Sequence, residues 1–297
     1  MHSFLKAVGF SNLEGRTEEE KLMNLVIENA SERQVAKLTD KRSAVEMYME
    51  VAEGVGIVIC GEYDERGNFH TEHYFPILKG QNSSMTEAVY VNKRVDTNAF
   101  TGMCDDYRVG VSLIFYVQNR IDLLNRPIPR RDRTKYPISL TALSGEGKIL
   151  LPVQKTKVET ERVKADLKNR SSLIAEAKKG NQEAMESLTL DDIDQYALVS
   201  KRIRTEDIYS IVETTFIPYG SESDNYTVLG YITDVRECVN SYTKEKLYIL
   251  SLLCNELSFE VCINQKNLLG TPAPGRRFRG NVWMQGRIEL LAGEAFQ

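Results

Sequence analysis

Apolar and polar positions follow two different periods along the first half of the chain. Apolar side chains recur at helical spacing over residues 22–26, and Thr17 followed by Glu20 forms the capping-box pattern that begins a helix. Over residues 44–51, AVEMYMEV, the period becomes two, which is typical of a strand with one buried face. The pattern therefore predicts a helix followed by a β-sheet.

The other strands of the first half are bounded by turn-forming residues. Residues 64–68, DERGN, predict a hairpin between two strands, and Gly145–Gly147 predicts another. Further strands are expected at residues 87–93, 108–118, 138–143 and 148–153. Strands preceded by short helices predict a β-rich α+β domain over residues 1–154.

The middle of the chain has a helical pattern. Charges of opposite sign alternate at helical pairing distance over residues 155–170, and Gly180 interrupts the helical pattern that follows. Thr189 precedes Asp191 and Asp192, and the dipole of a helix favours acidic residues in its first turn. We interpret these aspartates as capping residues rather than a metal site, and residues 155–204 as a helical connector.

Residues 205–297 return to strand patterns. Asn255–Glu256 predicts a tight turn between two strands, and the chain then passes a brief helical segment and a Pro/Gly loop. It ends in the alternating strand RRFRGNVWMQGRIEL. This order of elements resembles the oligonucleotide/oligosaccharide-binding (OB) fold, a small five-stranded barrel. We therefore expect an OB-like β-barrel domain over residues 205–297.

The bulk composition narrows the class of protein. Of the 297 residues, 42% are hydrophobic, and the net charge of −4 disfavours a protein that coats nucleic acid. The N-terminus lacks a secretory-signal pattern, and no apolar run is long enough to span a bilayer. The five cysteines have no CxxC spacing, so we expect reduced thiols in a cytoplasmic protein, with no metal centre and no cofactor.

The segment HTEH is the main candidate for chemistry in the first half. Because histidine is easily poised near neutral pH, His70, Glu72 and His73 could line a small-molecule pocket, with Asp106 as a further carboxylate. The aromatic neighbours of the segment indicate a strand, on which side chains three residues apart point to opposite faces. The two histidines are therefore not expected to bind one metal ion without a bulge.

Other catalytic templates are missing from the sequence. The segment GEGK at residues 145–148 lacks P-loop spacing, and there is no GxSxG or GxGxxG motif. Glu46, Tyr48 and Glu50 share one face of a strand, which we expect to be solvated. No catalytic residue is predicted.

The last strand places Arg277, Arg279, Trp283 and Arg287 on one face and apolar residues on the other. This face suits stacking on bases with phosphate contacts, or packing of the tryptophan against another domain or a second copy. From residue 207 to the end, the chain has eight basic and eleven acidic residues, which disfavours nucleic acid. We therefore interpret the face as a ligand or partner surface, with interdomain or dimer packing favoured.

Three segments give the chain its resemblance to a known family: MHSFLKAVGFSNL, GEYDERGNFHTEHYFPILKG and AKKGNQEAMESLTLDDIDQYALVSKRI. With these segments, the whole chain resembles an uncharacterised clostridial family, a domain of unknown function. The resemblance implies a cytoplasmic bacterial protein whose two halves belong together, and it brings no activity, ligand or catalytic residue.

The sequence thus favours a non-enzymatic binding or adaptor protein. Its barrel would engage a protein partner, a second copy of the chain or the N-terminal domain. One alternative is a small-molecule-binding or enzymatic first half that uses His73 and nearby carboxylates. The other alternative is single-stranded nucleic-acid binding by the barrel.

Overall fold

The chain forms two compact units. A computed structural model describes residues 2–94, 99–106, 111–129, 134–153, 208–221 and 223–290, together with 172–173, 176, 180–188 and 190. Residues 1–150 and 214–297 make up the first unit, and residues 151–213 make up the second, which contains helix α5 (Ile208–Ile211). The predicted boundaries at residues 154 and 204 lie outside the described residues, as does most of the predicted helical connector.

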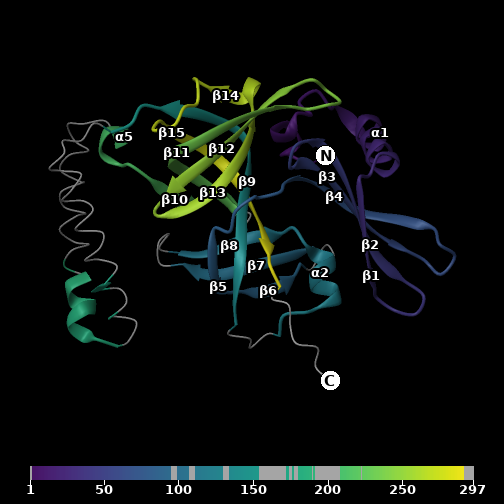
Figure 1. Ribbon diagram of the computed structural model, residues 1–297, viewed down its shortest axis with the longest axis horizontal. Coiled ribbons are helices and arrows are strands. Elements are labelled where there is room, and N and C mark those ends of the chain that lie inside the picture. The colour runs from purple at the N-terminus through teal and green to yellow at the C-terminus, as the bar shows by residue number, and fades with distance from the viewer. Residues whose placement is uncertain are drawn as a thin grey trace. The chain divides into compact units, whose positions relative to one another are not determined.

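The first unit begins with a 3₁₀ helix, η1 (Leu5–Val8), and helix α1 (Gly15–Glu28), which precede a small antiparallel sheet (Figure 1). The strands of this sheet pair in chain order: β1 (Glu32–Lys37), β2 (Ser43–Ala52), β3 (Val55–Tyr63) and β4 (Phe69–Leu78). The predicted hairpin at residues 64–68 joins β3 to β4 and is confirmed. Leu22 and Val26 of α1 are buried in the core that the small sheet helps to form.

The second, larger sheet combines strands from both halves of the chain. The first half supplies β5 (Met85–Ala88), β6 (Tyr90–Lys93), β7 (Phe100–Asp106), β8 (Val111–Val117) and β9 (Lys135–Leu150), with helix α2 (Arg120–Asn125) after β8. The second half supplies β10 (Thr215–Pro218), β11 (Asn225–Val239), β12 (Lys246–Cys254), β13 (Leu257–Asn264), β14 (Leu268–Leu269) and β15 (Arg277–Ile288), with η2 (Gln265–Asn267) after β13. The α+β class is confirmed.

Five strands of the large sheet close into a ring. In order around the ring they are β11, β12, β13, β9 and β15, and β15 pairs again with β11. Only the β13–β9 pairing is parallel. Each strand contributes a fully buried side chain to one core: Val228, Leu250, Val261, Ala142 and Met284.

The ring differs from the expected barrel in where its strands come from. We expected residues 205–297 to supply the barrel, yet β9 belongs to the first half and lies between β13 and β15. The OB-like assignment itself stays a prediction. The shared sheet explains why the two halves of the chain pack into one compact unit.

The predicted hairpin at Gly145–Gly147 is wrong, because β9 runs through these residues without a turn. Gly147 lies opposite Gly280 of β15, where the Phe278 ring crosses both strands. A Cβ atom on Gly147 would lie 2.4 Å from Cε2 of Phe278. This glycine therefore marks close packing and not a turn.

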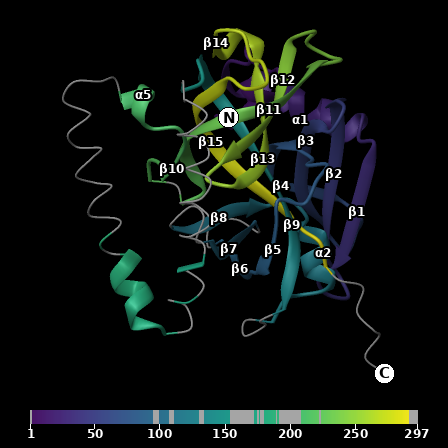
Figure 2. The same cartoon turned by 60° about the vertical axis from the view of Figure 1, so that its left-hand side comes forward.

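The outer face of the ring is covered by the N-terminal segment and the small sheet (Figure 2). Leu247, Ile249 and Cys262 point outward from the ring and are buried against η1 in a second core. We call the region where the small sheet meets β8, α2 and β15 the seam. Among the described residues, no helix combines the length and the apolar character needed to cross a membrane.

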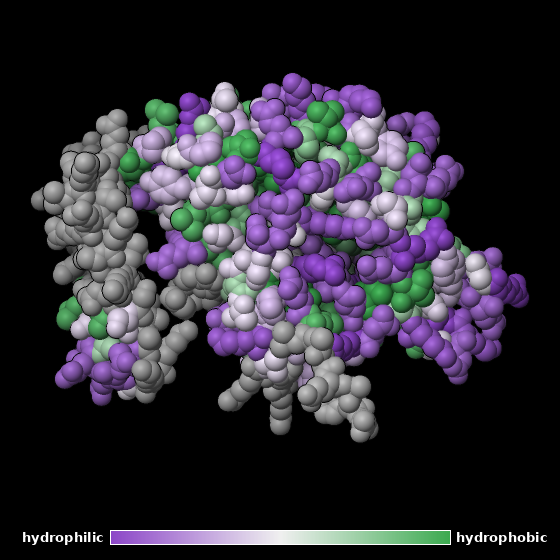
Figure 3. All heavy atoms as spheres, in the orientation of Figure 1, coloured by the Kyte–Doolittle hydropathy of each residue, from purple (hydrophilic) through white to green (hydrophobic). Residues whose placement is uncertain are grey.

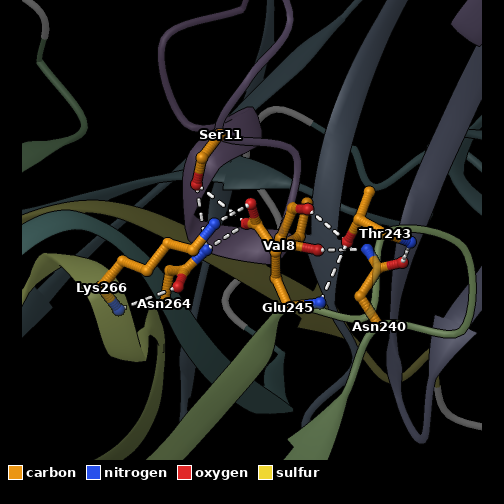
Figure 4. A network of polar contacts seen from close by, with 8 residues as sticks. Val8, Ser11, Asn240, Thr243, Glu245, Asn264 and Lys266 are labelled. Atoms are coloured by element: carbon orange, nitrogen blue, oxygen red, sulfur yellow. Dashed lines mark hydrogen bonds and ion pairs between the residues drawn. The ribbon is translucent and has the colours of Figure 1, made fainter.

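A polar network fastens the N-terminal segment to the ring (Figure 4). The buried Glu245 carboxylate accepts hydrogen bonds from Ser11 Oγ (2.9 Å), Asn264 Nδ2 (2.5 Å) and Lys266 Nζ (2.7 Å). Beside it, Asn240 Nδ2 donates to the Val8 carbonyl oxygen at 2.8 Å. These bonds satisfy polar groups that burial would otherwise leave without water.

Candidate functional site

Trp283 lies in the seam with 5% of its surface exposed. Its ring contacts four other rings, with centroids 4.7 Å from His2, 5.1 Å from Tyr116, 5.8 Å from Phe4 and 6.4 Å from Phe75. Its indole Nε1 donates a hydrogen bond to Asp224 Oδ2 at 3.0 Å. The tryptophan therefore packs inside the protein, where its ring faces are occupied by other side chains.

The three arginines of the same strand have different surroundings. Arg277 is 3% exposed, Arg279 is half-buried, and Arg287 is exposed beside Asp122, with Nη2 at 3.3 Å from Oδ2. With Trp283 and Arg277 both buried, the four predicted residues do not share one exposed surface. A role for them in binding a partner stays a prediction.

The two histidines of HTEH separate at a β-bulge. His73 pairs with Cys60 and Thr71 pairs with the next residue, Gly61, so Glu72 is the extra residue of β4. The expected alternation of faces does not hold across this bulge. His70 is exposed, with Nε2 at 3.1 Å from Asp64 Oδ2, whereas His73 Nε2 lies 3.2 Å from the Tyr116 hydroxyl.

Arg120 is the hub of a buried polar cluster in the seam. Its side chain is 3% exposed, and helix α2 carries it against the small sheet. Nε lies 3.2 Å from Glu46 Oε1, and Nη1 lies 2.9 Å from Glu72 Oε2. The Cys60 thiol donates to the same Oε1 of Glu46 at 3.6 Å. Glu72 thus takes part in the seam through its ion pair with Arg120.

Burial shifts the protonation equilibria of this cluster. Desolvation raises the pKa of Glu46 to about 7, although Arg120 acts in the opposite direction. Desolvation also raises the pKa of the Cys60 thiol well above its usual range. The pKa of His73 is lowered to about 4 by burial and by the charge of Arg120. Near neutral pH the thiol is therefore protonated and the imidazole uncharged, which makes both poor candidates for nucleophilic or acid–base catalysis.

A pocket of about 50 Å³, here called the seam pocket, opens beside this cluster. Its inner part is lined by buried residues, and Glu46, Tyr48 and Gln118 are among them. Lys79, Glu32 and Arg287 line its outer part, with side chains 35%, 50% and 48% exposed. Lys79 Nζ lies 2.7 Å from Glu32 Oε1 and 3.6 Å from the centroid of the Tyr48 ring.

The inner part of the seam pocket has unused hydrogen-bonding groups. The Tyr48 hydroxyl is buried and has no partner among the described residues. Both side-chain contacts of Glu46 use Oε1, and all three side-chain hydrogen bonds of Gln118 use Nε2. Glu46 Oε2 and Gln118 Oε1 therefore have no partner among the described residues and can accept a hydrogen bond. Because buried polar groups are almost always paired, such a group in a native protein calls for an explanation.

The arrangement is suited to holding a small polar molecule. It offers two free carboxylate or amide oxygens and one hydroxyl, which can donate or accept. Within the described ranges, no group of three or more His, Cys, Asp and Glu side chains is placed to hold a metal ion. The side chain of Asp106, which we considered with the histidines, lies outside the described residues.

Most of the seam pocket was not anticipated from the sequence. The expectation of a solvated face holds for Glu50, which is exposed, but it is wrong for Glu46 and Tyr48, which are 7% and 6% exposed. Helix α2 packs on this face of β2, with Arg120 against Glu46. Arg120, Gln118 and Lys79 were not singled out either. The one local signal was the polar QNR segment that directly follows the apolar strand β8.

Comparisons with known proteins give a family but no activity. No curated protein and no solved structure matches the chain significantly. A family model described as "Domain of unknown function, E. rectale Gene description (DUF3881)" matches residues 5–286. This match confirms the resemblance to an uncharacterised clostridial family. The chain belongs to the DUF3881 family, a family of unknown function that extends over both halves of the chain.

Proposed function

We propose that the chain is a non-enzymatic binding protein that holds a small polar molecule in the seam pocket. The observation that carries this proposal is the Tyr48 hydroxyl, which is buried beside the pocket and has no partner in the described part of the chain. Leaving such a group unpaired costs about 1–3 kcal/mol, and a ligand or water that pairs with it recovers that cost. Convergent polar groups in a partly enclosed pocket are typical of small-molecule sites.

Binding rather than catalysis is favoured by the state of the nearby reactive groups. The raised pKa of Cys60 disfavours the thiolate, and the lowered pKa of His73 keeps that ring uncharged. Arg120 is engaged by Glu46 and Glu72. A cytoplasmic location is part of the proposal, supported by the free thiols of all five cysteines.

A thermal-shift panel tests the proposal. The full chain is screened against small amino acids, amines, carboxylates, amides and polyols at 10 mM, alongside Tyr48→Phe and a control, Tyr219→Phe, whose ring is half-exposed. We expect at least one class to raise the Tm of the wild type and of Tyr219→Phe, and to raise that of Tyr48→Phe much less. Equal shifts in all three proteins, or no shift with any compound, would overturn the seam pocket as a binding site.

A protein partner or a second copy of the chain is the second candidate. The large sheet keeps apolar side chains exposed outside its cores: Ile217 is 54%, Tyr219 is 50% and Leu269 is 74% exposed. Hydrophobic residues lie in separate patches on the face shown in Figure 3, and exposed patches of this kind can mark interfaces. Nucleic acid is not part of the proposal, because the Trp283 ring is enclosed by other rings.

Sedimentation velocity tests this second candidate. If the exposed apolar residues form a contact between copies, the wild type sediments as a concentration-dependent oligomer. Ile217→Ser combined with Leu269→Ser then shifts it to the monomer. A monomer at every concentration would exclude self-association through these residues and leave a different protein as the partner to be sought.

A further inference from the structure

Three side chains that end in a carboxylate or an amide border the seam pocket. Gln34 of β1 lies directly opposite Glu46 of β2 in the strand register, and Gln118, which follows β8, lines the same pocket. Directly opposed residues of an antiparallel strand pair have neighbouring Cβ atoms. Strands β1 and β2 and the segment after β8 therefore bring three hydrogen-bonding groups to one small space.

Two oxygen atoms at this pocket can accept hydrogen bonds from a ligand. Arg120 and the Cys60 thiol both contact Oε1 of Glu46, and the Gln118 side chain makes its three hydrogen bonds through Nε2. Among the described residues, neither Glu46 Oε2 nor Gln118 Oε1 is a fully enclosed unpaired atom. A molecule in the pocket can therefore reach both oxygens.

The same pocket offers hydrogen-bond donors. Gln34 is half-buried, and its side-chain amide pairs with none of the described residues. An amide nitrogen has two N–H donors, and the hydroxyl of Tyr48 can donate one more hydrogen bond. A ligand that uses the whole pocket must therefore present donors to the two oxygens and an acceptor to the amide nitrogen.

A primary carboxamide meets both requirements within one planar group. Its NH₂ group has two N–H donors, one for each free oxygen, and its carbonyl oxygen can accept two hydrogen bonds. A carboxylate has no donor for Glu46 and Gln118, and an ammonium group has no acceptor for Gln34. The arrangement of donors and acceptors thus favours an amide over either ion.

The size of the pocket limits the ligand. A volume of about 50 Å³ holds about four water molecules, and so a ligand of about four non-hydrogen atoms. We propose that the seam pocket binds a small primary carboxamide of the size of acetamide, with its NH₂ group at Glu46 and Gln118 and its carbonyl oxygen at Gln34. This proposal rests on the proposed function of the seam pocket as a binding site.

The test compares acetamide with acetone and acetate, which have the same number of non-hydrogen atoms but no N–H donor. Each compound is titrated against the full chain with ¹³C-labelled methyl groups, because the methyl groups of Val58 and Ile77 line the pocket. The titrations are made at pH 8, above the pKa of Glu46, so that its carboxylate is ionised. We expect saturable shifts of these methyl signals with acetamide at millimolar concentration, and at least tenfold weaker binding of acetone and acetate.

Two variants test the assigned contacts. Glu46→Gln replaces an accepting carboxylate and should weaken acetamide binding about tenfold. Gln34→Met removes an amide that pairs with none of the described residues, so the fold should persist while acetamide binds about fivefold more weakly. Gln81→Met is the matched control, because this glutamine is exposed and lies outside the pocket. Its affinity for acetamide should equal that of the wild type.

The outcomes separate this proposal from the proposed function. If acetone or acetate binds as tightly as acetamide and depends on Tyr48, the amide is the wrong class of ligand and the binding function stands. The same holds if another compound of the thermal-shift panel binds through Tyr48 while acetamide does not bind. If acetamide binds equally well to the wild type, Glu46→Gln and Gln34→Met, the seam pocket is not its site and the proposal is overturned.

Discussion

Glu245 and Glu46 are two buried carboxylates of the first unit with opposite surroundings. Glu245 uses both oxygens, which accept hydrogen bonds from Ser11, Asn264 and Lys266. Glu46 uses only Oε1 and shares its cation with Glu72. A complete network of this kind fixes a segment in place, whereas an incomplete one beside a pocket has capacity left for a ligand.

The pKa shifts of the two carboxylates have opposite signs for this reason. Burial alone would raise the pKa of Glu245, but hydrogen bonds from Lys266, Ser11 and Asn264 outweigh it and lower the pKa. At Glu46, desolvation dominates over Arg120 and raises the pKa to about 7. The ionised form is thus favoured in one network and disfavoured in the other.

The largest effect is expected from Arg120→Met, because it removes a buried cation that contacts both Glu46 and Glu72 in the seam. Removing one partner from a buried ion pair costs about 3–5 kcal/mol of unfolding free energy, measured by urea denaturation. Arg287→Met is the matched control on an exposed pair and should cost less than about 0.5 kcal/mol. A loss below about 1 kcal/mol for Arg120→Met would mean that the seam is not held by this hub.

Neutralising either carboxylate should change the unfolding free energy by different amounts in the two networks. Glu245→Gln turns an acceptor into a donor amid existing donors and should lower the unfolding free energy by about 2–3 kcal/mol. Glu46→Gln should cost far less at pH 8. The pKa of Glu46 is about 7 in the folded protein, against 4.5 in the unfolded chain, so the wild type loses stability as pH rises from about 4.5 to 7. The Glu46→Gln variant should lack this pH dependence. Equal losses for both variants at pH 8 would contradict the comparison.

Acidification should lower the stability of the protein in part through His73. Its folded pKa of about 4 lies below the usual 6.5, so the unfolded chain takes up a proton first as pH falls below 6.5. The wild type therefore loses about 1–2 kcal/mol between pH 7 and pH 5 through this residue, and His73→Gln should remove that part of the loss. His70→Gln, exposed on the hairpin, serves as the control. An unchanged pH dependence in His73→Gln would show that the seam admits a proton freely.

The smallest effect concerns two buried tyrosines. Tyr226→Phe removes two hydrogen bonds between the hydroxyl and the backbone of Ile114, at 2.8 and 3.0 Å, and should cost about 1–2 kcal/mol. None of the described residues pairs with the Tyr48 hydroxyl, so Tyr48→Phe should leave stability unchanged or raise it by up to about 1 kcal/mol. Denaturation of both variants decides the point: a cost for Tyr48→Phe equal to that for Tyr226→Phe would mean that the hydroxyl is already paired.

Local sequence patterns predicted the positions of the strands better than the pairing between strands. The positive φ angles of Asn255 and Glu256 confirm the predicted tight turn, since such angles suit the two-residue hairpin loops. The insertion of β9 into the ring could not be predicted, because parallel pairing between segments more than 100 residues apart leaves no local signal. The glycines of β9 suggested a turn, but a close approach of another side chain requires the same residue type: Phe278 lies against Gly147, and Lys6 lies against Gly145.

The candidate site was harder to predict than the fold. The polar face of β2 has the pattern of a solvated strand, and Glu46 and Tyr48 become buried there only in the folded protein, where helix α2 packs on this face. The bulge at Glu72 has no signature in HTEH, although it determines which side chains reach the seam. The sequence indicated that Trp283 and its neighbouring arginines share one strand face. It did not indicate that the rings of His2 and Phe4 pack against the tryptophan on that face.

The most direct test of the difference between the two networks is the titration of their carboxyl groups by ¹³C NMR in the full chain. The structure predicts a pKa of about 7 for Glu46 and a pKa below the usual 4.5 for Glu245. These values would show one carboxylate with unused capacity and one that is fully engaged. A pKa for Glu46 at or below 4.5 would show that Arg120 already completes its network, and would contradict the seam pocket as a site in need of a ligand.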